Sequence, residues 1–162
     1  STPKPSSAAS DVYKRQPLES EQILRTQRAR IDDPDRLRQF DFISRAAVSD
    51  TARLDTLFNS LLAAENRRIE PWTTAVIRYL NHPLREDQSV KYIRPGLEVL
   101  EEVQRTGDIF FPKNWAAALL GNHLGSSAYE EVVRFLNERP DYSPLLKNKI
   151  LQAAYPLYRA NN

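Results

Sequence analysis

The stretch EPWTTAVIRYLNHP, residues 70–83, carries a complete set of helix signals and decides the fold of the chain. Pro71 suits the first turn of an α-helix, because the N–H that proline lacks has no intrahelical partner there. Pro83 disfavours helical geometry at the preceding residue, so the helix must end before His82. Between these limits, apolar side chains at spacings of three and four predict one buried face: Trp72, Ala75, Val76, Tyr79 and Leu80.

The same signals recur on both sides of this stretch. Pro34, Pro112 and Pro144 stand at the starts of further periodic segments, and Ser127 with Glu130 predicts a capping box. No segment alternates apolar and polar residues, and no Asn-Gly or Asp-Gly hairpin signal occurs. The sequence therefore predicts an all-α fold of about seven helices, starting near residues 33, 51, 70, 86, 112, 127 and 143.

Two prolines fall inside predicted helices. Pro95 should clash with the carbonyl of Lys91, so we expect a kink or a break near Arg94 in the helix that starts at Glu86. Pro156 should bend the last turns of the final helix.

The connections between the predicted helices are short, which implies antiparallel neighbours. Helix pairs recur about every 40 residues, the period of HEAT-like α-solenoids. We favour a stack of antiparallel helical hairpins over a four-helix bundle with extra helices. Residues 32–160 form the expected single helical-repeat domain, and residues 17–31 a linker or a partial helix.

Residues 1–16 differ from the rest of the chain. They are rich in Ser, Pro and Ala, which predicts disorder. Residues 10–16, SDVYKRQ, resemble a translated adapter at the end of an assembled sequence, so the tail is expected to be non-native; a natural flexible tail is the alternative. The segment lacks the apolar stretch of a signal peptide.

Composition limits the function classes. The chain has no cysteine, which excludes disulfides, thiolate nucleophiles and Cys-based zinc sites but fits any compartment. No apolar run is long enough for a membrane span. The net charge is +2, and the nearest approach to a basic stripe, Arg25, Arg28 and Arg30, is followed by acidic residues. We expect no nucleic-acid binding.

The residue types that carry catalysis are scarce. His82 and His123 are the two histidines, and neither belongs to a His-Glu-x-x-His zinc motif. His82, at a helix end, is expected to bond terminal carbonyls or meet the helix dipole. The segment from Gly121 to Gly125 is expected to be a turn. No catalytic, cofactor or metal-binding residue is assigned to this chain.

The remaining candidate residues also have structural interpretations. The acidic pairs Glu101–Glu102 and Glu130–Glu131 point in different directions on a helix and are expected to be solvated. Trp72 and Trp115 could form a stacking platform for a ligand, but core packing is favoured. Phe110-Phe111-Pro112 is interpreted as a hydrophobic staple.

Several stretches, in order and spacing, resemble the C-terminal region of bacterial aminopeptidase N-like zinc metallopeptidases over roughly residues 30–160. They are Asn66-Arg67, Glu70-Pro71-Trp72, residues 79–85 (YLNHPLR), 91–95 (KYIRP), 97–104 (LEVLEEVQ), 105–112 (RTGDIFFP) with Trp115, Phe135-Leu136, 139–142 (RPDY) and 146–154 (LKNKILQAA).

The resemblance implies a role without chemistry for this chain. In the family, an upstream domain carries the zinc helix His-Glu-x-x-His, a distal Glu ligand and a Gly-x-Met-Glu-Asn strand, none of which occurs here. The C-terminal helical domain packs on the catalytic domain and restricts peptide access to its active site. Zinc is expected only in that missing domain, the parent would hydrolyse N-terminal residues from peptides, and the adapter-like start suggests a gene fragment.

Two alternatives remain. The first is a stand-alone helical-repeat scaffold that binds a protein partner on a concave face. The second is a small enzyme with an unrecognised site, which the scarcity of His, Cys and Gly disfavours. A domain that covers a partner should keep an exposed apolar surface when it is separated from that partner.

Overall fold

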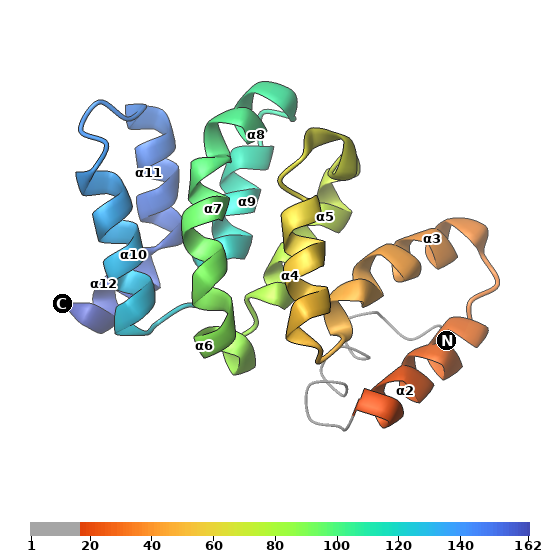
Figure 1. Cartoon of the computed structure of the whole chain (residues 1–162). Helices are drawn as coiled ribbons and strands as arrows, with labels where there is room; N and C mark the ends of the chain where they lie inside the picture. Colours follow the sequence, from red (N-terminus) through yellow and green to blue (C-terminus); the bar gives the residue numbers. More distant parts are fainter. Residues whose placement is uncertain (1–16) are drawn as a thin grey trace.

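The computed structural model describes residues 17–162, and every regular element in this range is helical (Figure 1). The all-α prediction is confirmed, but with more and shorter helices than the seven expected. The α-helices are α2 Pro17–Ala29, α3 Pro34–Ile43, α4 Thr51–Ser60, α5 Glu70–Leu80, α6 Glu86–Ser89, α7 Ile93–Glu98, α8 Leu100–Thr106, α9 Phe111–Leu120, α10 Ser126–Asn137, α11 Pro144–Ala153 and α12 Tyr155–Asn161. Four 3₁₀ turns join them: η1 Ser44–Ala47, η2 Ala64–Asn66, η3 Pro83–Arg85 and η4 Val90–Tyr92.

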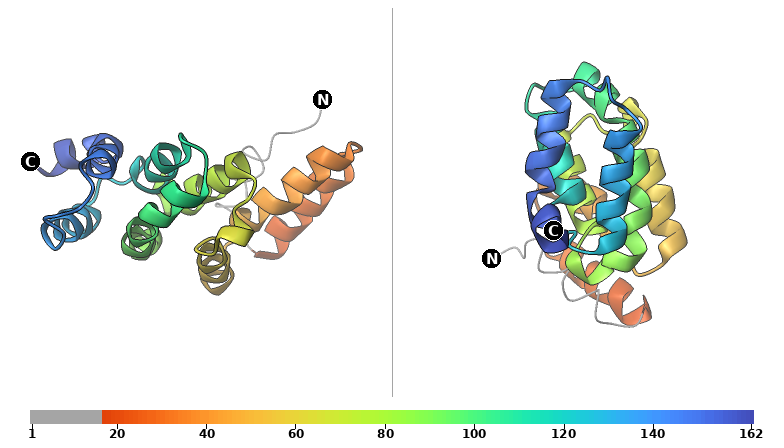
Figure 2. Two further views of the ribbon diagram at one scale, coloured as in Figure 1. Left: turned by 90° about the horizontal axis from the view of Figure 1, so that it is seen from above. Right: turned by 90° about the vertical axis from the view of Figure 1, so that its left-hand side faces the viewer.

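The helices form a stack of antiparallel hairpins arranged in two layers. Seen from above, α4, α7 and α10 lie in one row and α5, α9 and α11 in the other (Figure 2). Helix α9 packs against both α5 and α11, and α7 packs against α10. We call α4, α6, α7, α8 and α10 layer A, and α5, α9 and α11 layer B. Helices α2 and α3 extend the stack beyond α5.

The contacts between successive hairpins repeat at a nearly constant sequence distance. Asp55 accepts hydrogen bonds from Lys91 and Tyr92, 36 and 37 residues away. Glu70 accepts from the backbone of Asp108, 38 residues away. Arg94 donates to Glu131, 37 residues away. These separations agree with the repeat of about 40 residues expected for a HEAT-like stack.

Prolines account for two of the extra helix ends. Pro95 stands in the first turn of α7, and the expected break lies just before it, at η4 Val90–Tyr92, which includes the residue that Pro95 would clash with. The final predicted helix is likewise divided at Ala154, directly before α12 with Pro156 in its first turn. Both interruptions follow from the ring and the missing N–H of proline.

One core runs through both layers. Trp115 of α9 is fully buried and donates from Nε1 to the carbonyl of Gly96 in α7, 2.9 Å away. A Cβ on Gly96 would lie 2.6 Å from the Leu119 side chain, so a larger residue here would force Leu119 to shift. The core prediction for Trp115 is confirmed, and Trp72 lies half-buried against Phe42, with ring centroids 5.8 Å apart.

Only part of the N-terminal segment for which we made predictions lies within the described residues. Residues 17–31, expected as a linker or a partial helix, contain α2. Arg28 of this helix forms a bidentate ion pair with Asp41, in which Nε and Nη2 donate to the two carboxylate oxygens at 2.8 and 3.0 Å. The predicted disordered, adapter-like tail, residues 1–16, lies outside the described residues.

Candidate interaction surface

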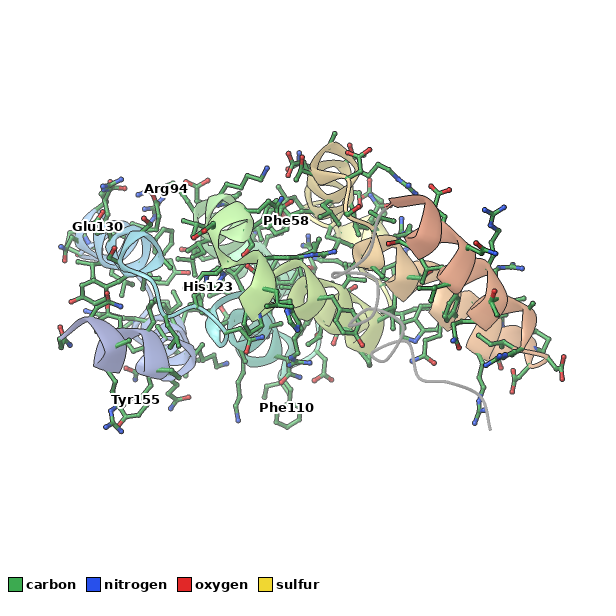
Figure 3. All side chains as sticks on the ribbon, turned by 90° about the horizontal axis from the view of Figure 1, so that it is seen from below. Phe58, Arg94, Phe110, His123, Glu130 and Tyr155 are labelled. Atoms are coloured by element: carbon green, nitrogen blue, oxygen red, sulfur yellow. The ribbon has the colours of Figure 1, made fainter. Side chains whose placement is uncertain are left out.

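His123 lies in a buried polar cluster between the layers. It occupies the turn between α9 and α10, and its side chain is fully buried (Figure 3). Its Nε2 is 2.8 Å from Oδ1 of Asn81, whose amide nitrogen donates to the carbonyl of Ile77. Because Asn81 thus presents its oxygen to the ring, Nε2 carries the proton and Nδ1 is bare.

Glu86 completes this cluster and fixes the turn. Its Oε1 lies 4.0 Å from His123 Nδ1 and accepts the backbone N–H groups of Leu124 and Gly125 at 2.6 Å each. Burial lowers the pKa of His123, although the Glu86 charge opposes that shift. A neutral histidine with no exposed atom cannot contact a substrate, so the cluster holds two repeats together.

This arrangement corrects the predicted capping box at Ser127. Helix α10 begins at Ser126 with Gly125 as its N-cap, and no side chain of the cap residue bonds the first turn. The turn is instead held by Glu86, which arrives from another helix. Local spacing alone could not reveal a partner 39 residues away.

The other sequence candidates have structural roles. His82 accepts the Leu84 N–H at its Nδ1, 3.1 Å away, and so caps η3 rather than the preceding helix. Glu102 was expected to be solvated, but it pairs at 3.0 Å with the buried guanidinium of Arg67. Glu131, also expected to be solvated, pairs with Arg94 at 3.2 Å, whereas Glu101 and Glu130 are exposed.

The staple prediction at Phe110-Phe111-Pro112 is wrong. Phe111 is buried, but Phe110 is 66% exposed and the preceding Ile109 is 77% exposed. Phe110 is the N-cap residue of α9, so its side chain precedes the helix and projects away from the core. These two residues are part of a larger pattern that sequence analysis missed.

The exposed large apolar residues of the described range flank the three helices of layer B. One set lies at or before the starts of α5, α9 and α11, and the other follows their ends. Leu84 and Leu124 also lie two residues before α6 and α10, in the segments that join the two layers. The first set is Ile69, Ile109, Phe110 and Leu145; the second is Leu84, Leu124 and Tyr155.

Two of these residues, Phe110 and Tyr155, lie on the same side of the molecule (Figure 3). Phe110 and Tyr155 project from the layer B side, whereas Arg94 and Glu130 lie on the opposite side (Figure 3). An open, shallow depression lined by Asn148, Leu151, Gln152 and Tyr155 lies on the layer B side. The apolar residues recur with the repeat, and that recurrence is the sequence signal that would have found them.

The described residues offer no metal centre. They contain no group of three or more His, Asp or Glu side chains placed to hold an ion. No described helix combines the length and the apolar character needed to cross a membrane.

Comparison with protein families, with curated proteins and with solved structures gave no match.

Proposed function

We propose that this chain is a non-catalytic docking domain, and that layer B packs on the catalytic domain of an aminopeptidase N-like zinc metallopeptidase and restricts peptide access to its active site. The observation that carries the docking role is the recurrence of exposed apolar side chains at both ends of every layer B helix. Large apolar side chains that stay exposed in every repeat are candidates for a surface that a partner covers. The aminopeptidase partner rests on the sequence resemblance.

The distribution of charge also favours layer B, rather than layer A, as the docking surface. Arginines of layer A engage acidic residues of neighbouring repeats, as Arg94 does with Glu138 at 2.9 Å. Such paired charges are already satisfied within the chain and need no partner. Layer B combines exposed apolar groups with few charges, which is the composition expected of an interface centre.

Peptidase assays test whether this chain is part of a zinc aminopeptidase. Aminoacyl fluorophores are supplied, with added zinc, to the chain alone and to the natural protein extended upstream through its catalytic domain. We expect turnover by the extended protein alone. Turnover by the isolated chain, or an extended protein without peptidase activity, contradicts the proposal. In the latter case a stand-alone scaffold becomes the better interpretation.

Dye binding tests the docking surface itself. Ile109→Ser combined with Phe110→Ser should lower the fluorescence of a hydrophobic dye bound to the isolated chain, because these are the most exposed large apolar side chains of the described residues. Glu130→Ser, on exposed layer A surface, is the matched control and should leave the signal unchanged. Equal dye binding by wild type and double variant contradicts an apolar docking surface at this position.

A further inference from the structure

Layer B carries cations that the chain does not neutralise. Arg78 on α5, Lys113 on α9 and Lys147 on α11 are exposed. None of the three forms an ion pair with a residue of the described range. The sequences of α9 and α11 contain no acidic residue. The exposed charges of α9 and α11 are therefore all positive, and exposed apolar residues lie at the ends of these helices.

The single acidic residue of these three helices is already engaged. Glu70, the first residue of α5, accepts the Asp108 N–H at 2.8 Å and so holds the loop before α9. Its carboxylate lies beside Gly107 and Asp108, in the loop that leads into α9. The remaining charged residues of α5, α9 and α11 are all cations.

Layer A shows the opposite arrangement. Lys91 pairs with Asp55 at 2.7 Å, and Arg94 is surrounded by Glu98, Glu131 and Glu138. Hydrogen bonds from Lys91 and Tyr92 lower the pKa of Asp55, and the hydrogen bond from Arg94 lowers that of Glu138. Lys91 and Arg94 are thereby paired inside the chain, whereas Arg105 on α8 forms no ion pair with a described residue.

We infer that layer B docks against an acidic protein surface that also presents apolar side chains. This inference rests on the proposed docking role and adds the chemistry of the partner. Complementary charge orients an encounter and sets its salt dependence, while the apolar residues at the helix ends supply contact area. A nucleic acid is the poorer fit, since a phosphate backbone with one charge per about 1.7 Å requires a continuous basic stripe. The cations here are separated by apolar and amide side chains.

A labelled random copolymer of glutamate and tyrosine is a defined probe for this chemistry. We expect the isolated chain to bind it at low ionic strength and to bind more weakly at about 0.15 M salt, where charges are screened beyond roughly 8 Å. Lys113→Glu combined with Lys147→Glu should lower the affinity by about tenfold or more. Arg105→Glu is the matched control, because Arg105 is an exposed cation on α8 of layer A; its effect should be less than about twofold.

Circular dichroism of each variant verifies that the helices are retained. Absence of binding at low ionic strength overturns the inference, and so does an equal loss for Arg105→Glu. Equal affinity for plain polyglutamate contradicts the apolar part, and tighter binding of a single-stranded oligonucleotide contradicts a protein partner. The assay measures no peptidase activity, so its failure is distinguishable from failure of the aminopeptidase assignment.

Discussion

The two layers of this stack are built from the same kind of helix but differ in what they leave unsatisfied. In layer A, charged side chains reach the next repeat and pair there, as Lys91 does with Asp55. In layer B, Lys113 and Lys147 have no acidic partner in the described range, and apolar residues such as Phe110 remain exposed. Under the proposed docking role, layer A uses charge pairs to join repeats, and layer B is the surface that meets the partner.

In the interior, by contrast, the two layers share one hydrophobic core. Core residues of both layers form a single cluster, and Trp115 hydrogen-bonds across it to Gly96. The contrast between the layers is therefore confined to the surface. Substitutions in the core should lower the stability of both layers together. Substitutions at the surface should have different effects on stability in layer A and in layer B.

The largest effect is expected at the centre of this shared core. Trp115→Ala removes a fully buried ring and its bond to Gly96, and should lower the free energy of unfolding by about 3–5 kcal/mol. Phe110→Ala, five residues earlier and 66% exposed, should change it by less than about 0.5 kcal/mol. Denaturant titration followed by circular dichroism measures both. Two separate transitions in wild type would contradict a core shared by the layers.

Much of the fold could be predicted because its signals are local. Pro34, Pro71, Pro112 and Pro144 all stand in the first turn of a helix, where proline fits. Asp33 caps its helix by accepting N–H groups of the first turn. Such signals depend on backbone geometry within a few residues, so the sequence contains all that is needed.

The surface could not be predicted in the same way because its signals depend on distant partners. Glu102 and Glu131 lie in acidic pairs that were expected to be solvated, yet each meets an arginine one repeat away. Phe110 was assigned to a staple because an aromatic residue beside a helix start usually packs inward, but its neighbour Phe111 takes the buried position. Which of two adjacent residues faces the core depends on the register of the next repeat.

A smaller effect is expected at the polar link between the layers. His123→Leu removes the donor to Asn81 Oδ1 in a buried site, which should cost about 1–3 kcal/mol of unfolding free energy at pH 8. In wild type, burial lowers the folded pKa of His123 below its unfolded value of about 6.5. The folded state then binds fewer protons than the unfolded state, so wild-type stability falls as pH drops through about 6.5 toward the lowered pKa.

The variant lacks this titration, and its disadvantage should shrink as the pH falls below about 6.5. Denaturant titrations across this range measure the difference. A constant gap between wild type and His123→Leu at all pH values would contradict a buried neutral histidine.

The smallest expected change in unfolding free energy gives the most direct comparison of the two layers. Arg94 lies within 4 Å of Glu98, Glu131 and Glu138 and joins α7 to α10. Arg94→Ala should cost about 0.5–1 kcal/mol at low ionic strength and less at high salt, because partly exposed ion pairs are weak and screened. Arg78→Ala in layer B removes a cation that pairs with no described acidic residue. It should leave the free energy of unfolding unchanged at either salt concentration.

Denaturant titrations of both variants at low and high salt therefore measure in which layer the charged side chains stabilise the fold. A salt-dependent loss confined to Arg94→Ala supports the assignment of layer A to stability. An equal, salt-dependent loss in Arg78→Ala would mean that layer B also depends on its cations for folding. Those cations would then be committed to the fold, and the case for an acidic partner on that side would lose its basis.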